Sequence, residues 1–172
     1  MYVKDGSTGK SSSFVIRMAN IVEMPHAVNH FLRMVEEKLW DGLSFVHEYG
    51  SHVVMATPLT KDASHTWAGQ RFSDAGLTHM AFTESSTSYP PPHLRKYSVA
   101  FSGRPGGPSF YINFDDEIET SHEHESTFGV VTEGRDVILQ FYHQAHEDKD
   151  TKKMMSIESI EITTPVLNAG NP

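Results

Sequence analysis

The chain contains eleven histidines, and two of them lie in an acidic run that could hold a divalent metal. The run spans residues 115–125 and has six carboxylates and no basic residue. His122 and His124 are two residues apart, so an extended backbone would put their side chains on one side. Imidazole and carboxylate ligands suit zinc or another divalent ion. A solvated acidic loop explains the same residues, because nothing in the spacing fixes a coordination geometry; both histidines are weak metal candidates.

A second pair of histidines, His143 and His146, is spaced three residues apart on a predicted helix. Residues at this spacing share a helix face and could chelate a metal. Surface histidines near the C-terminus of a helix, favoured by its dipole, are the alternative explanation.

The residues that several other kinds of chemistry require are absent from the sequence. The chain has no cysteine, which excludes disulfides, thiolate catalysis and cysteine zinc sites. The glycine-rich residues 103–107 lack the Lys-Ser/Thr pair of a phosphate-binding loop, and no nucleophile elbow is present. We expect no cofactor.

The composition indicates one soluble globular domain. Of the 172 residues, 38% are hydrophobic and 21% are charged, enough for a substantial core. The net charge of −8 argues against nucleic acid or an anionic membrane as a partner. No apolar run approaches the roughly 20 residues of a membrane span. No targeting signal identifies a compartment, and the native protein could be longer.

The clearest structural signal is residues 97–114, YSVAFSGRPGGPSFYINF. Tyr97, Val99 and Phe101 alternate with small residues, the two-residue period of a half-buried strand, and Phe110 begins a second such strand. The Gly/Pro-rich residues between them cannot continue a ladder and predict a turn. An aromatic sheet face beside such a loop suits a peptide-sized groove.

Further strands and two helices flank this hairpin. Apolar residues at helical spacing predict helices over 25–39, begun by Pro25, and over 137–145. Strands are predicted over 13–18, 43–49, 52–56, 127–132 and 157–163, and residues 57–96 look irregular. Two groups of strands with two segregated helices favour an antiparallel closed barrel capped at its ends.

Four segments resemble the cyclophilins, which are peptidyl-prolyl cis-trans isomerases. They are the hairpin at 97–114, the helix start PHAVNHF at 25–31, DGLSF at 41–45, and FGVVTEGRDVI at 128–138. The resemblance covers roughly residues 13–163. It implies a mainly β fold, a cyclophilin-like closed antiparallel eight-stranded barrel capped by two α-helices. Residues 1–12 would then be a linker or a short strand or hairpin, and residues 164–172 a C-terminal tail.

The resemblance also implies where catalytic residues should lie, and this chain departs from that pattern. His47 falls where the family has its catalytic arginine, although a one-residue slip would put Glu48 there. His52 and Val53 fall on the Phe-Met pair of the proline pocket, and Met55 on a glutamine. The other substrate-binding positions are occupied by Phe45, Phe101, Ser102, Phe110 and Tyr111.

We therefore expect weak or absent isomerase activity, with binding of a proline-containing peptide or protein partner, or an assembly role. Arginine stays charged and offers a planar fork of donors, whereas histidine is mostly neutral near pH 7. The alternative is an active isomerase that uses protonated His47, or a loop arginine from Arg71, Arg95 or Arg104. We expect a monomer.

Overall fold

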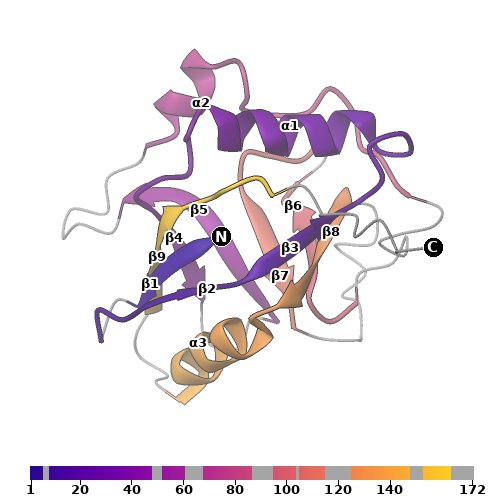
Figure 1. Ribbon diagram of the computed structural model, residues 1–172. Coiled ribbons are helices and arrows are strands. Elements are labelled where there is room, and N and C mark those ends of the chain that lie inside the picture. The colour runs from indigo at the N-terminus through magenta and orange to yellow at the C-terminus, as the bar shows by residue number, and fades with distance from the viewer. Residues whose placement is uncertain are drawn as a thin grey trace, which may run out of the picture.

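The structure is a computed structural model that describes residues 1–5, 8–47, 52–60, 68–86, 95–103, 105–114, 125–147 and 153–163. Its strands form a single sheet, ordered β2-β1-β9-β4-β5-β7-β6-β8-β3, in which neighbouring strands are antiparallel (Figure 1). The strands are β1 (Tyr2–Asp5), β2 (Ser11–Ser13), β3 (Val15–Met18), β4 (Leu43–His47), β5 (Val53–Thr60), β6 (Ser98–Phe101), β7 (Phe110–Asn113), β8 (Thr127–Glu133) and β9 (Lys153–Ser159).

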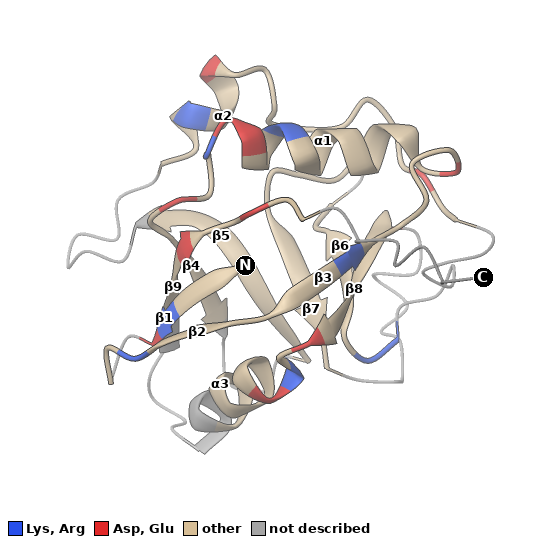
Figure 2. Cartoon of the chain, viewed as in Figure 1, with Lys and Arg blue, Asp and Glu red and all other residues tan. Residues whose placement is uncertain are grey.

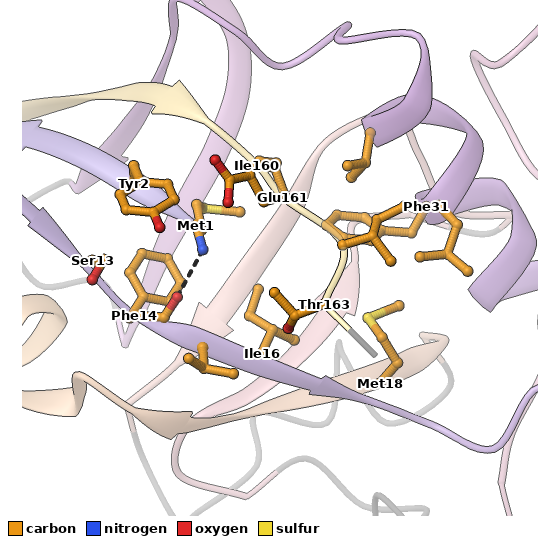
Figure 3. A pocket seen from close by; sticks show the side chains of 14 residues that line it. Met1, Tyr2, Ser13, Phe14, Ile16, Met18, Phe31, Ile160, Glu161 and Thr163 are labelled. Atoms are coloured by element: carbon orange, nitrogen blue, oxygen red, sulfur yellow. Dashed lines mark hydrogen bonds between the residues drawn. The ribbon is translucent and has the colours of Figure 1, made fainter. Parts of the chain in front are cut away.

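The two ends of the sheet are joined through one residue, Phe14. Strands β2 and β3 stand at opposite ends of the order, yet they are consecutive in the chain. The Phe14 N–H donates to the Met1 carbonyl across 3.0 Å, and the Met1 ammonium donates to the Phe14 carbonyl across 2.8 Å (Figure 3). This seam confirms the predicted barrel. The structure has nine strands rather than eight because the expected strand at 13–18 is interrupted at Phe14 and extends back to Ser11.

Aromatic side chains fill the inside of the barrel. Phe45, Phe101 and Phe110 lie on the inner face and have no exposed surface. Phe31, from the helix above, contacts Phe110 with ring centroids 5.3 Å apart and Phe128 at 4.8 Å. The contact with Phe110 is edge-to-face, a geometry that adds to the free energy gained by burial. The described residues of the inner face therefore form a filled core.

Helices cover both ends of the barrel, as predicted, and a third, short helix is present (Figure 1). Helix α1 (Pro25–Glu36) lies across one end and α3 (Arg135–Glu147) across the other. The short helix α2 (Gln70–Asp74) falls in the stretch expected to be irregular. Its Phe72 is buried against Trp40, with ring centroids 5.0 Å apart, so a single aromatic contact anchors a helix too short to show periodicity.

Two further local predictions were wrong. The closing strand spans 153–159 rather than 157–163, because Met155 and Ile157 face the core while Ile162 is about half exposed. The hairpin strands β6 and β7 were expected to be half-buried, but every residue in both is buried. Their outer face is therefore covered as well as their inner face.

Charged residues are dispersed over the described part of the chain and do not gather on one face (Figure 2). Within the same part, no helix is long and apolar enough to cross a membrane.

Candidate functional site

A small apolar cluster lies on the outer face of the sheet. Register partners share a face, and Tyr111 of β7 pairs with Ala100 of β6 on one side and Met55 of β5 on the other. Ala100 and Tyr111 are fully buried, and the partly buried Val53 and Met55 pack against them. We call these four residues the outer-face cluster. Its two partly exposed members offer apolar surface to a ligand.

The side chain of Tyr111 is held in place by Glu125. The Tyr111 hydroxyl donates to the Glu125 carboxylate across 2.6 Å, and the Gly103 N–H donates to the other carboxylate oxygen, also across 2.6 Å. Hydrogen bonds to an ionised acceptor are short and strong. Glu125 therefore joins the outer-face cluster to the turn after β6. In the sequence Glu125 is one of the six carboxylates of the acidic run, and its spacing does not predict these hydrogen bonds.

A polar cavity of about 390 Å³ adjoins the cluster at Ser102, the residue after β6. The backbone here is tightly bonded: Ser102 N–H donates to Ser109, and Gly107 N–H donates to Ser102. The cavity is lined by Gly69, Gln70, Ser73, Thr78, His79, Ser102, Gly107, Pro108 and Ser109. An extended ligand could therefore contact apolar surface at the cluster and hydrogen-bonding groups beside it. Among these lining residues, Ser102 is the one that the sequence predicted to bind substrate.

The substrate-binding residues predicted from the sequence lie on two different faces. Val53, Met55 and Tyr111 meet in the outer-face cluster. Phe45, Phe101 and Phe110 lie on the inner face and belong to the core. A residue and its neighbour along a strand point to opposite faces, so Phe110 and Tyr111 cannot both face a ligand.

The two histidines proposed near the site stand at strand ends. His47 is the last residue of β4 and pairs with Lys153 of β9; its side chain lies outside the described residues. His52 is exposed just before β5, and its carbonyl accepts a hydrogen bond from Phe114 N–H across 2.9 Å. Val46, the residue before His47, is the register partner of Met55. The register thus places Val46, and not His47, opposite a member of the outer-face cluster.

The structure describes two of the three loop arginines that the sequence offered as alternatives to His47. The Arg71 guanidinium donates to the Asp41 carbonyl across 3.1 Å, at the entrance to β4. Arg95 is exposed ahead of β6, where its backbone N–H donates to Ser98 Oγ. Arg104 and Glu48 lie outside the described residues. The structure therefore records no guanidinium contact with the outer-face cluster among the residues it describes.

The metal candidates His122 and His124 lie outside the described residues. Over the rest of the chain, the described His, Asp and Glu side chains form no group of three able to hold an ion. His143 is exposed, and its ring meets that of Tyr142 edge-on with centroids 5.7 Å apart. The side chain of His146 is not among those described.

A separate apolar pocket of about 170 Å³ lies at the barrel seam, beneath α1 (Figure 3). Phe14, Ile16, Met18, Phe31 and Ile160 line it, and it shares no residue with the outer-face cluster. Its Met1 ammonium donates to the Phe14 carbonyl and so belongs to the seam itself. We regard it as a packing gap of the seam.

Comparisons with known proteins agree with this architecture. The family model for cyclophilin type peptidyl-prolyl cis-trans isomerase/CLD matches residues 6–162. No curated protein matches the chain in sequence. A cyclophilin type peptidyl-prolyl cis-trans isomerase of Cryptosporidium parvum, solved in the presence of the dipeptide Ala-Pro, is similar in structure, with a TM-score of 0.54 and 11% identity over 93% of this chain and 100% of that chain. A second structure of that isomerase has a TM-score of 0.55 and 10% identity, covering 93% and 98%.

Proposed function

Because the chain belongs to the cyclophilin type peptidyl-prolyl cis-trans isomerase family, we propose that its outer-face cluster binds proline-containing peptide while isomerising the prolyl bond weakly or not at all. The binding surface is the partly exposed Val53 and Met55 around the anchored Tyr111. The adjoining cavity at Ser102 accommodates the residue that precedes or follows the proline.

The observation that carries the reduced activity is the identity of residue 47. Rotation about a prolyl bond faces a barrier of about 18–20 kcal/mol because the amide has double-bond character. A catalyst lowers it by binding the twisted bond better than the planar one, and a fixed cation near the imide is an effective way to do so. β4 ends in histidine at the position that the family resemblance assigns to arginine. A mostly neutral imidazole supplies less of that stabilisation.

Apolar binding survives this exchange because it depends on different residues. A proline ring is an apolar group, and its transfer from water to the cluster is favourable in proportion to the area buried. Val53 and Met55 are apolar and partly exposed, and they pack against the buried Tyr111, which Glu125 holds in place. Retained binding with lost catalysis is therefore the combination that these residue types favour.

Peptide titration followed by amide chemical shifts tests the binding site. A proline-containing tetrapeptide is expected to move the signals of Ala100, Tyr111 and Met55. Met55→Lys places a charge on the cluster without opening the core and should weaken binding about tenfold or more, since burying an unpaired ammonium is costly. Val22→Lys is the matched control, because Val22 is 82% exposed and distant in sequence from the cluster. Shifts confined to the seam pocket, or equal loss in both variants, would contradict this location.

A further inference from the structure

A second cavity, of about 260 Å³, lies between α1 and residues 77–81. It is lined by Pro25, His26, Asn29, His30, Arg33, Leu77, His79, Met80 and Ala81. Four of these residues can carry positive charge, Asn29 offers an amide donor, and none is acidic. In a chain with a net charge of −8, such a lining is distinctive.

The cations of this cavity are available to a ligand. His26, Arg33 and His79 are exposed. Within the part of the chain that the structure describes, no carboxylate pairs with the Arg33 guanidinium. Glu84, at the start of α1, is committed to the helix: its carboxylate accepts the backbone N–H groups of His26 (3.2 Å) and Ala27 (2.7 Å).

His30 forms the floor of the cavity. Its Nε2 is buried and has no hydrogen-bond partner among the described residues, and its ring meets Phe101 edge-on with centroids 5.5 Å apart. Burial first, and then the charges of Arg33 and His79, lower the pKa of this imidazole. The groups facing His30 are therefore positive from α1 and from residues 77–81, while β6 offers it only an aromatic ring. An anion in the cavity would relieve this repulsion.

The arrangement does not suit a metal. The described imidazoles and carboxylates form no group of three close enough to hold an ion, which leaves the histidines as donors rather than ligands. Arginine, moreover, repels cations and presents a planar fork of N–H groups that matches the oxygens of phosphate.

We propose that this cavity binds a phosphate-class oxyanion, held by the Arg33 guanidinium and by the N–H groups of the His26 and His79 imidazoles. The anion is either free phosphate or the phosphate of a phosphorylated side chain. His79 also lines the polar cavity at Ser102, so a peptide whose phosphorylated side chain enters the cavity at Arg33 would lie beside the outer-face cluster. The proposal does not depend on isomerase activity or on peptide binding.

Histidine titration by NMR in sodium phosphate and in sodium chloride of equal ionic strength tests the proposal. Phosphate is expected to raise the pKa of His30 relative to chloride, and Arg33→Gln should remove this difference. Because Arg33→Gln removes charge-assisted hydrogen bonds to the anion, we expect it to lower the affinity for phosphate about tenfold or more. Lys10→Gln is the matched control: it removes the same charge from the β1–β2 hairpin, on another part of the barrel (Figure 1), and should keep the response.

The two sources are separated by probes. Phosphoserine that binds as tightly as inorganic phosphate means that the phosphate group alone is recognised. A phosphoserine peptide that binds about tenfold more tightly than both, with its unphosphorylated form inert, identifies a phosphorylated side chain as the ligand. His79→Gln, at an exposed residue, should weaken each of these interactions. Equal titrations in phosphate and chloride, or an unchanged phosphate response in Arg33→Gln, would overturn the proposal.

Discussion

The hydroxyl of Tyr111, a β7 residue with no exposed surface, donates a hydrogen bond across 2.6 Å to the carboxylate of Glu125, two residues before β8. The same carboxylate accepts the Gly103 N–H. One side chain therefore fixes both the aromatic wall of the outer-face cluster and the turn that leads to the polar cavity.

Replacing Glu125 should destabilise the protein. In Glu125→Ala the Tyr111 hydroxyl and the Gly103 N–H both lose their hydrogen bond to the Glu125 carboxylate, and a hydrogen bond to a charged group is worth about 1.5–3 kcal/mol. Denaturant unfolding measures this change, and Glu158→Ala, at an exposed carboxylate of β9, provides the control. Equal stability of the two variants would show that the Tyr111–Glu125 hydrogen bond contributes nothing.

Glu84 acts as the N-terminal cap of α1 from a distance of more than fifty residues. Its two carboxylate oxygens accept the first free N–H groups of the helix, those of His26 and Ala27. Loss of a cap costs about 0.5–2 kcal/mol, so Glu84→Ala should lower the free energy of unfolding by that amount. Glu37→Ala, at an exposed residue beyond the other end of α1, should be nearly neutral when both are unfolded in urea. A neutral Glu84→Ala would contradict the capping role.

The lowered pKa of His30 predicts a pH dependence of stability. The unfolded chain takes up a proton on this residue near pH 6.5, while the folded chain does so only at lower pH. The contribution of His30 is therefore complete above about 6.5 and is lost as the pH falls from there through the folded pKa. Between pH 7.5 and 5, a range chosen to bracket about 6.5, the midpoint temperature of thermal unfolding should fall less steeply in His30→Gln than in the wild type.

His143→Gln serves as the control for this experiment, because His143 is exposed on α3. The stability of His143→Gln should fall with decreasing pH as steeply as that of the wild type. If the two histidine variants behave alike, His30 is not the group responsible.

Gly134 is required where the chain passes the barrel seam. Its φ is +69°, and a Cβ added there would meet Phe14 Cα at 2.8 Å and the Ser13 carbonyl at a still shorter distance. Gly42 has a similar φ of +77° but open space around it. Gly42→Ala should therefore cost only the left-handed backbone penalty, about 1–2 kcal/mol. Gly134→Ala adds the clash and should cost about 3 kcal/mol or more. Equal costs in urea unfolding would contradict the tight seam.

The sequence was sufficient to predict the barrel because its alternation and turn residues are strong local signals. The hairpin at 97–114, the helix begun by Pro25 and the strand at 127–132 all reappear with bounds shifted by only a few residues. The ninth strand was not predictable: the interruption at Phe14 depends on its pairing with Met1, a contact that no local pattern encodes. Similarly, β9 begins earlier than its isoleucines suggested, because its register with β1 and β4 buries Met155.

The site was predicted less completely than the fold. Sequence motifs identified strands that carry it, but both Phe110 and Tyr111 looked like wall residues, and only register and burial separate the inner from the outer face. Glu125 and His79 escaped notice because their roles depend on turns that bring distant residues together. The chemical effect of histidine at position 47 remains a prediction.

A prolyl isomerisation assay on the wild type beside His47→Arg tests the central claim most directly. We predict that the wild type turns over a proline-containing tetrapeptide about a hundredfold more slowly than an ordinary cyclophilin measured in parallel, the typical cost of removing one fixed electrostatic donor. His47→Arg should recover at least part of that rate. Ordinary turnover by the wild type would contradict the account, and a slow His47→Arg variant would show that the outer-face cluster lacks more than its cation.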